Sequence, residues 1–279
     1  MKNHGLTLRF FSTLIVMALI LVGCTKDEAD TSEQQNTDEL RMASEMDDIE
    51  VALEDVIIVS YEGQESLESN RMSNLPPVLP DCVTVTVLIQ QNHREITLDF
   101  GSEGCFVHGR LLRGQIVMTY DRNPEAQEIL ISYTLIDFYI NQRQVIGNRT
   151  ILRELSNING NPQFTHSLQL TVIWPNGMQA SRDGLKVREW IEGFGSGDFA
   201  DNVFEITGHW NSTFVNGNTH SHVVVTPLRR EATCLHFVSG TVDVERTNFS
   251  GVLDFGDGTC DDQATFTFEN GNVINISLN

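Results

Sequence analysis

Four aspartates lie close together around one glycine-rich turn near the end of the 279-residue sequence: Asp254, Asp257, Asp261 and Asp262. Carboxylate oxygens on such a loop are typical ligands of Ca²⁺. The alternating Asp-x-Asp-x-Asp-Gly spacing of a calcium loop is absent, and aspartates near glycines also form turns that their own side chains close by hydrogen bonds. We therefore predict a structural turn here and assign no metal ligand.

Two histidines, His220 and His222, flank Ser221 in a segment expected to be a strand, so their side chains share one face. Imidazole nitrogens bind zinc, and a third ligand such as His209 or His236 would have to approach to complete a site. Exposed histidines on a strand are the more common outcome, and we expect that outcome here.

The three tryptophans, with two phenylalanines, are the candidates for an aromatic platform that binds sugars: Trp174, Trp190, Trp210, Phe194 and Phe199. Large aromatic side chains offer flat apolar surfaces to a ligand, but they also fill cores and sheet faces. The sequence leaves both interpretations open and favours packing.

Patterns of well-known catalytic sites are missing. Neither Gly-x-Ser-x-Gly nor His-Glu-x-x-His occurs. The glycine-rich run 192–198 lacks the Lys-Ser/Thr pair of a phosphate-binding loop, so we interpret it as a connection. A formal net charge of −20 disfavours nucleic acid as a partner, because an acidic surface repels phosphate. We expect a protein without enzymatic activity, catalytic residues or cofactor.

The elements that carry these residues are mostly strands. From Val83 onward, apolar and polar residues alternate and β-branched side chains are frequent. The clearest strand, 164–174, has its apolar residues on one face: Phe164, Leu168, Leu170, Val172 and Trp174. Further strands are predicted at 83–89, 115–120, 129–136 and 145–152, and only 186–191 is a doubtful helical stretch.

Asn-Gly pairs lie between predicted strands at 159–160, 176–177, 216–217 and 270–271. The pair favours hairpins because both residues accept positive φ. The sequence therefore predicts an all-β domain, a mostly antiparallel meander of about a dozen strands. Such a long sheet must curl, fold into a sandwich or close into a barrel, and the sequence does not choose among these.

The segment 24–80 differs in composition and is predicted to be an acidic tether. Residues 24–81 hold 16 acids but only Lys26, Arg41 and Arg71 as bases. The stretch 25–48 is polar enough to stay disordered. Apolar residues at three- and four-residue steps predict a helix over 38–60. Prolines at 76, 77 and 80 interrupt regular structure, so we place the β domain at 81–279.

Five cysteines are present, and four of them form a duplicated pattern. Cys82 and Cys234 each precede a predicted hairpin that ends in Leu-Asp-Phe-Gly, an acidic residue near a glycine, and then Cys105 or Cys260. Because a hairpin returns its second strand beside its first, we predict the disulfides Cys82–Cys105 and Cys234–Cys260. The two disulfide-closed hairpins indicate related halves or ends of the domain.

The fifth cysteine, Cys24, ends a segment typical of a lipoprotein signal peptide. Residues 1–23 have a basic start and an apolar core, 10–22, that is too short to cross a bilayer. Leu21-Val22-Gly23-Cys24 resembles a lipobox, which makes Cys24 the lipidated first residue of the mature chain. Palmitate and related acyl chains on Cys24 would then anchor the protein to a membrane.

The charges next to Cys24 indicate where the protein goes. Lys26-Asp27-Glu28 resembles the signal that sends lipoproteins of Bacteroidetes-type bacteria to the outer face of the outer membrane. We therefore predict an outer-membrane, cell-surface location, with the periplasmic face as the alternative. Removal of Lys2 and Arg9 with the signal peptide changes the formal charge from −20 to −22.

Several segments together resemble a group of uncharacterised predicted lipoproteins of Bacteroidetes-type bacteria: 79–86, the Asp-Phe-Gly steps, 109–116 and 254–261. The resemblance implies an envelope location and a shared β fold, and it assigns no activity, because the group has none assigned. We predict a lipid-anchored, non-enzymatic binding or adhesion module for a glycan or another envelope protein. A structural envelope component and a hydrolase of extracellular polymers are the alternatives.

Overall fold

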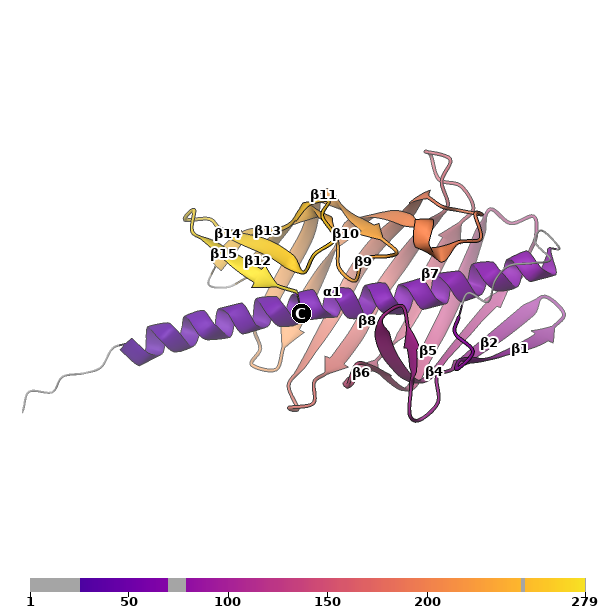
Figure 1. Cartoon of the computed structure of the whole chain (residues 1–279), viewed down its shortest axis with the longest axis horizontal. Coiled ribbons are helices and arrows are strands. Elements are labelled where there is room, and N and C mark those ends of the chain that lie inside the picture. The colour runs from indigo at the N-terminus through magenta and orange to yellow at the C-terminus, as the bar shows by residue number, and fades with distance from the viewer. Residues whose placement is uncertain (1–25, 70–78, 247–248, 279) are drawn as a thin grey trace, which may run out of the picture. The chain divides into compact units, whose positions relative to one another are not determined.

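A computed structural model of the chain describes residues 26–69, 79–246 and 249–278, with only the backbone described for 26–37. The chain divides into two compact units, Met1–Thr37 and Asp38–Asn279. The second unit contains the sheet and the rest of a long helix (Figure 1). The predicted signal peptide and Cys24 lie outside the described residues, as do residues 247–248 within the second predicted hairpin. No helix among the described residues is both long and apolar enough to cross a membrane.

The described chain consists of one α-helix, fifteen strands and one short 3₁₀ helix. The helix is α1 (Lys26–Glu68), and η1 (Phe199–Asp201) is the 3₁₀ turn. The strands are β1 (Thr84–Gln90), β2 (His93–Asp99), β3 (Cys105–Val107), β4 (Arg110–Asp121), β5 (Glu128–Ile140), β6 (Arg143–Ile146), β7 (Asn148–Glu154), β8 (Gln163–Ile173), β9 (Gln179–Glu192), β10 (Val203–Phe214), β11 (Thr219–Glu231), β12 (Ser239–Arg246), β13 (Phe249–Asp257), β14 (Gln263–Phe268) and β15 (Val273–Ser277).

All strands belong to one antiparallel sheet in which neighbours in sequence are mostly neighbours in space. The order is β1-β2-β4-β5-β6-β8-β9-β10-β11-β12-β13-β14-β15, with β3 beside β4 and β7 paired with β5 and β8. The predicted antiparallel meander is thus confirmed. The predicted inner face of 164–174 is buried as expected, and 186–191 belongs to strand β9 and is not helical.

The Asn-Gly pairs form turns, but only the glycine of each pair has positive φ, between 83° and 85°. At Asn176-Gly177, the Gly177 amide donates to the Trp174 carbonyl, and the Asn176 side chain accepts from the Met178 amide. The same two hydrogen bonds recur at 216–218 and 270–272. The expectation of positive φ at both residues is therefore wrong: the loops combine a type I turn with one left-handed glycine.

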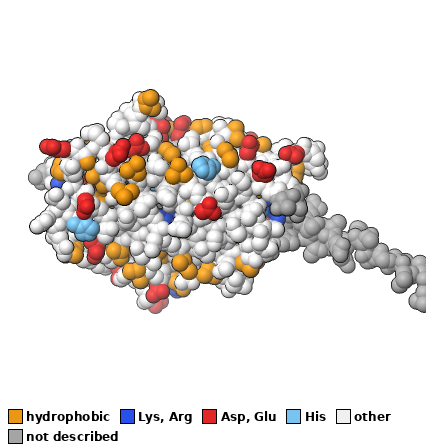
Figure 2. All heavy atoms as spheres, turned by 180° about the vertical axis from the view of Figure 1, so that it is seen from behind, with side chains coloured by type: hydrophobic (Ala, Val, Ile, Leu, Met, Phe, Trp, Pro, Cys, Tyr) orange, Lys and Arg blue, Asp and Glu red, His pale blue; other side chains and the backbone are white. Residues whose placement is uncertain are grey.

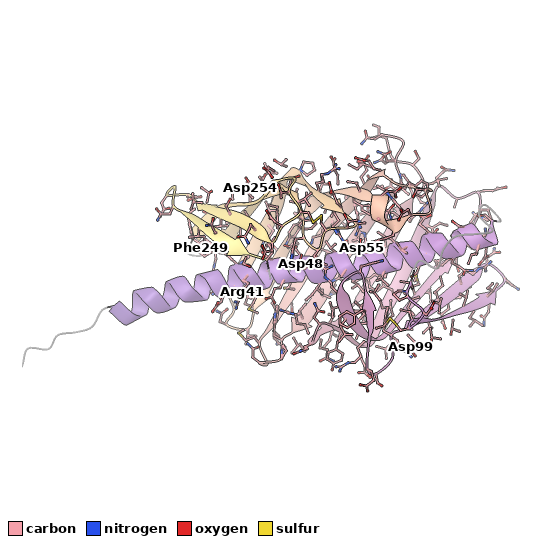
Figure 3. The ribbon with its side chains drawn as sticks, in the orientation of Figure 1. Arg41, Asp48, Asp55, Asp99, Phe249 and Asp254 are labelled. Atoms are coloured by element: carbon pink, nitrogen blue, oxygen red, sulfur yellow. A yellow bond between two sulfur atoms is a disulfide. The ribbon has the colours of Figure 1, made fainter. Side chains whose placement is uncertain are left out.

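The two predicted disulfides are confirmed, with Cα–Cα distances of 5.7 Å for Cys82–Cys105 and 5.6 Å for Cys234–Cys260. They close the hairpins β1–β2 and β12–β13. In each Leu-Asp-Phe-Gly segment, the aspartate accepts a hydrogen bond from the glycine amide, as Asp99 does from Gly101 at 2.8 Å. Figure 3 shows the two aspartates, Asp99 and Asp254, at separate places in the sheet.

The sheet curls around α1. The sequence had left a curled sheet, a sandwich and a barrel open. Residues 51–59 are all buried, which is more than two helical turns, so every side of the helix is covered there. Met46 and Leu53 pack in a core with strands of the first two thirds of the sheet, and Leu40 and Val51 pack in a second core with the later strands. The predicted helix 38–60 exists and is longer. The part of the predicted tether from Asp38 onward lies inside the domain.

Candidate functional site

Acidic side chains of α1 meet basic side chains of the sheet along the buried length of the helix. Eleven of the thirteen Lys and Arg residues in 82–279 form ion pairs with carboxylates of α1. They are Arg94, Arg110, Arg122, Arg143, Arg149, Arg153, Arg182, Lys186, Arg188, Arg230 and Arg246. We call these residues and their carboxylate partners on α1 the charged seam. Figure 2 shows the molecule from behind, where Lys and Arg appear only as small patches.

Glu50 lies at the centre of the charged seam and is fully buried. Its Oε2 atom accepts hydrogen bonds from Lys186 Nζ at 2.6 Å and from Arg182 Nη1 at 3.2 Å. Arg149 Nη2 lies 3.6 Å from the other carboxylate oxygen. Burial alone raises a carboxyl pKa, but Lys186, Arg182 and Arg149 together lower the pKa of Glu50 to about 2. Glu50 is therefore ionised at neutral pH.

Glu54, one helical turn further, has a different environment. Its nearest basic groups are His166, at 3.4 Å, and Arg188, at 3.6 Å, and its Oε1 atom has no hydrogen-bond partner. Burial therefore outweighs the attraction of Arg188 and raises the pKa of Glu54 to about 7. Burial and Arg188 also hold the pKa of His166 well below its usual range. Glu54 consequently changes its charge near neutral pH.

The centre of the charged seam positions α1 but offers no access to a ligand. Arg182, Arg188 and Glu50 have at most 1% of their surface exposed. A buried charge that loses its partner is strongly unfavourable, so the pairs between α1 and the sheet fix the rotation and register of the helix. The C-terminal end of α1 is thereby held against the sheet connections, where the molecule has an accessible cavity.

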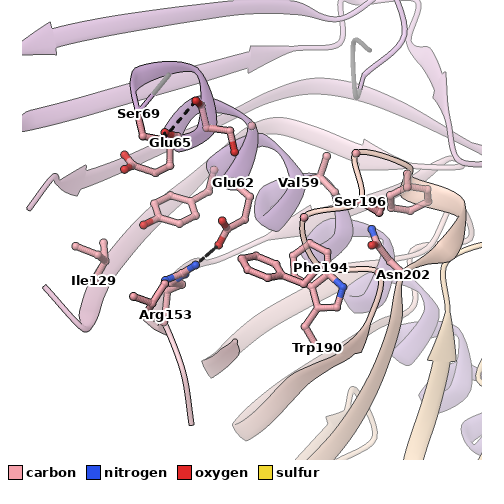
Figure 4. Close-up of a pocket in the computed structure, with 18 of the residues that line it drawn as sticks. Val59, Glu62, Glu65, Ser69, Ile129, Arg153, Trp190, Phe194, Ser196 and Asn202 are labelled. Atoms are coloured by element: carbon pink, nitrogen blue, oxygen red, sulfur yellow. Dashed lines mark hydrogen bonds and ion pairs between the residues drawn. The ribbon is translucent and has the colours of Figure 1, made fainter. Parts of the chain in front are cut away.

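A pocket of about 740 Å³ lies at this end of α1 (Figure 4). Its walls come from residues 59–69 at the end of α1 and just after it, from the turn between β4 and β5, from the end of β7 and from the connection between β9 and β10. The glycine-rich run 192–198 is this last connection, as predicted, and it forms one side of the pocket. The volume is that of a site for a small ligand.

Two aromatic rings shape this side of the pocket. Phe194 and Trp190 are 5.0 Å apart between ring centroids, with their planes at 73°. Phe194 is 46% exposed, whereas Trp190 is only 6% exposed. Phe194 therefore presents its ring to the cavity, and Trp190 supports it from within.

Two ion pairs form the opposite side of the pocket, where α1 ends. Arg153 donates to Glu62 at 2.9 Å, and Arg122 donates to Glu65 at 3.0 Å. Tyr120 donates a further hydrogen bond to Glu65 at 2.9 Å. Because each arginine is engaged by a carboxylate, neither presents an uncompensated positive charge to a ligand.

Two buried polar atoms of the pocket lining have no partner. They are the indole nitrogen of Trp190 and the side-chain oxygen Oδ1 of Asn202. Trp190 is 6% exposed and Asn202 is 4% exposed. A buried polar group without a hydrogen bond is unfavourable by about 1–3 kcal/mol. Both atoms belong to side chains of the pocket wall, but the atoms themselves are closed to solvent.

The aromatic residues named from sequence separate into two groups. Trp190, Phe194 and Phe199 line the pocket together. Trp174 and Trp210 are buried elsewhere, which confirms the predicted core packing for these two. Trp174 donates to Glu45 at 2.6 Å, and Trp210 lies under Lys186, 4.2 Å from its Nζ atom.

The expectation that His220 and His222 are exposed is wrong. They are 0% and 2% exposed, because their face of β11 is turned toward α1. His220 Nε2 lies 3.1 Å from Glu39. His209 lies on the outer face, and His236 pairs with Asp48 at 2.8 Å, so neither completes a zinc site. No cluster of three metal-ligating residues occurs in the described part of the chain.

The aspartate-rich turn has the predicted structural role. Asp254 accepts from the Gly256 amide at 2.9 Å, and Asp261 accepts from the Gln263 amide at 3.0 Å. Asp257 accepts from both the amide and the hydroxyl of Thr259, and these bonds lower the pKa of Asp257. The carboxylates are thus used in closing the turn.

Sequence reasoning missed the charged seam and Asn202. A signal for the seam was present in β9. Arg182, Lys186 and Arg188 are each an even number of residues from Trp190, so they lie on the same face of the strand as this residue, which was expected to be buried. Cations at core positions are informative because they require partners. For Asn202 we find no sequence signal, because its importance comes from the folding of the β9–β10 connection.

Comparison with protein-family models, with curated proteins and with solved structures finds no match. The resemblance to uncharacterised Bacteroidetes-type lipoproteins stays a prediction.

Proposed function

We propose that this protein is a lipid-anchored envelope protein that binds a glycan in the pocket at the end of α1 and does not modify it. One observation carries the proposal: the pocket combines an exposed aromatic ring, Phe194, with exposed polar side chains of its lining, among them Asn123 and Asp198. Ligand sites characteristically pair apolar surface with a few convergent polar groups.

A sugar fits this lining better than a lipid or an anion. A sugar ring has an apolar C–H face for Phe194, and its polar substituents donate and accept hydrogen bonds. An alkyl chain would cover polar side chains of the lining without hydrogen-bonding them, at about 1–3 kcal/mol for each group that it buries unpaired. An anion would face Glu62, Glu65 and Asp198 of the lining, with both nearby arginines already engaged.

Binding without catalysis is favoured over hydrolysis by the same ion pairs. Glycoside hydrolases use two carboxyl groups on either side of the scissile bond, one of them as an acid. Glu62 and Glu65 both line the pocket, but Arg153 and Arg122 hold them as ion-pair partners. Product analysis after incubation with bound glycans checks this: shortened oligosaccharides would identify a hydrolase.

The membrane attachment rests on the lipobox at Cys24 and on Lys26-Asp27-Glu28. We propose an outer-membrane location with the domain on the cell surface, and the periplasmic face is the alternative. Protease treatment of intact cells tests this, because only a surface-exposed protein is digested before the cells are broken.

The binding proposal is tested with the full chain, purified from membranes and placed in lipid nanodiscs so that detergent does not fill the pocket. A glycan array identifies ligands, and titration calorimetry measures affinity. Phe194→Ala should weaken binding at least tenfold, because the ligand loses its aromatic contact. Phe106→Ala is the matched control, since Phe106 is 68% exposed and lies outside the pocket lining. Absence of any glycan ligand would support a structural role instead.

A further inference from the structure

Strand β1 (Thr84–Gln90) forms one edge of the sheet. Its only neighbour among the described strands is β2, with which it pairs over all seven residues in an unbroken register. The strand at the other edge is β15, and Figure 1 shows the two at opposite ends of the sheet. The backbone N–H and C=O groups on the outer side of β1 therefore offer a template for a further strand.

β1 lacks the features that normally protect an edge strand from pairing. Such strands are commonly short, charged, interrupted by proline or distorted by a bulge. β1 has the sequence Thr-Val-Thr-Val-Leu-Ile-Gln, without a charge or a proline, and its pairing with β2 contains no bulge. The disulfide Cys82–Cys105 also ties the chain just before β1 to the start of β3. The edge is thus held in extended form, which lowers the entropic cost of adding a partner strand.

Apolar side chains on both faces of β1 are exposed. Val85 lies opposite Leu98, which is fully buried, but Val85 itself is 49% exposed. Ile89, on the same face as Val85, is 55% exposed, and Leu88, on the other face, is 46% exposed. The cover over β2 therefore ends before β1, and a partner strand would remove these side chains from water.

We propose that β1 pairs antiparallel with β1 of a second copy of the chain, so that the two sheets join into one. A two-fold axis at Val87 makes this contact self-complementary. Val85 then lies opposite Ile89 of the other copy on one face, and Thr86 lies opposite Leu88 of the other copy on the other face. The inference goes beyond glycan binding, since no residue of β1 lines the pocket.

Charge explains why a second copy fits this edge. The chain has a formal charge of −20, so most contacts between two copies would place acids against acids. β1 itself is uncharged, and the carboxylates of β2, Glu95 and Asp99, lie one strand further inward. In the joined sheet the two β2 strands are three strand spacings apart, about 14 Å, which exceeds the screening length of about 8 Å at physiological salt. The two hairpins therefore join without a close pair of carboxylates.

A head-to-tail contact between β1 and β15 is the alternative use of the two edges. Such a contact does not close on itself in a pair and would build chains of copies. β15 (Val273–Ser277) has five residues, and its Ile276 is already buried. Because β15 is shorter and leaves less apolar surface uncovered, pairing of β1 with itself is favoured.

The register is tested with single cysteines in the full chain, expressed in cells whose envelope forms disulfides. Val87→Cys should give a disulfide-linked dimer on a non-reducing gel, because the two-fold axis brings Val87 to within about 5.5 Å of its counterpart, Cα to Cα. Val85→Cys is the matched control on the same face, since four residues along the strand separate it from its counterpart by about 14 Å. Cross-linking at position 85 equal to that at position 87 would overturn the proposed register.

The affinity is measured by sedimentation velocity on the full chain in density-matched detergent. We expect dimers, and Ile89→Glu should raise the dimer Kd at least tenfold, because it places a charge against an apolar side chain. Val273→Glu, at a 59% exposed position of β15, is the matched control and should leave the Kd unchanged. Added salt should lower the Kd, because screening weakens the repulsion between two acidic copies.

Three results would overturn the proposal. One is a chain that stays monomeric up to about 100 μM, toward the weak end of the affinity scale of specific complexes. Another is assembly beyond the dimer that Val273→Glu abolishes, which would show head-to-tail pairing. The third is a dimer whose Kd is the same in Ile89→Glu, which would place the contact elsewhere on the molecule.

Discussion

Glu50 provides the sharpest test of the charged seam. Glu50→Gln preserves the shape of the side chain and removes its charge, which leaves Lys186, Arg182 and Arg149 without their common partner. A pKa lowered from 4.5 to about 2 corresponds to a stabilisation of about 3 kcal/mol at neutral pH. Removal of one partner from a buried ion pair destabilises proteins by about 3–5 kcal/mol, so the two estimates agree.

The assay is urea unfolding at pH 7.5, followed by tryptophan fluorescence, since all three tryptophans are buried. For a domain of this size we also expect the melting temperature to fall by roughly 6–12 °C. Glu205→Gln, on the exposed face of β10, is the matched control and should change stability by less than about 0.5 kcal/mol. A loss below about 1 kcal/mol for Glu50→Gln would refute the role given to the seam.

The pH dependence of this difference follows from the direction of the shift. The pKa of Glu50 is lowered in the folded state, so its stabilisation is complete above pH 4.5 and is lost as the pH falls toward 2. The gap between the wild-type chain and Glu50→Gln should therefore close over this range. A constant gap would show that the cations do not act through the charge of Glu50.

Three further results are expected. The folded-state pKa of Glu54 is raised to about 7, so the free energy of unfolding of the wild type should fall as the pH rises from 4.5 through 7. Glu54→Gln lacks this titration, so its free energy of unfolding should rise relative to that of the wild type by about 3 kcal/mol between pH 4.5 and 8. Urea unfolding across this range measures the effect, and parallel curves would contradict it. Replacement of Cys82 and Cys105 by serine should lower the free energy of unfolding by about 3 kcal/mol, because their disulfide closes a loop with a sequence separation of 23. Cys24→Ser should move the protein from the detergent phase to the aqueous phase in a partition assay, and retention in the detergent phase would argue against the lipobox.

Much of the fold was predictable because its signals are local. Alternation in 164–174 identified a strand with one buried face, and the Asn-Gly pairs located turns. The disulfides were predictable for the same reason, since each joins the ends of one hairpin. Each of these features depends on residues that are near one another in the chain.

The candidate site was less predictable, because its parts come from distant segments. Phe194 and Trp190 were named as aromatic candidates, but nothing in the sequence placed them beside the end of α1. His220 and His222 were expected in solvent and are buried, because the face of β11 that they share is turned toward α1. Whether a polar residue on a strand is exposed depends on which face the rest of the chain covers.

By itself, the sequence determined the strands, the turns, the disulfide pairing and the predicted address at Cys24. Only the tertiary structure decided that the sheet curls around α1 and that the acids of an apparent tether are the partners of buried arginines. The pairs Arg182–Asp47 and Arg188–Asp55 join residues 135 and 133 positions apart. Charges are normally expected at the surface. Their burial becomes favourable only when the curled sheet brings the opposite charge of α1 to each of them, and no local pattern specifies that curvature.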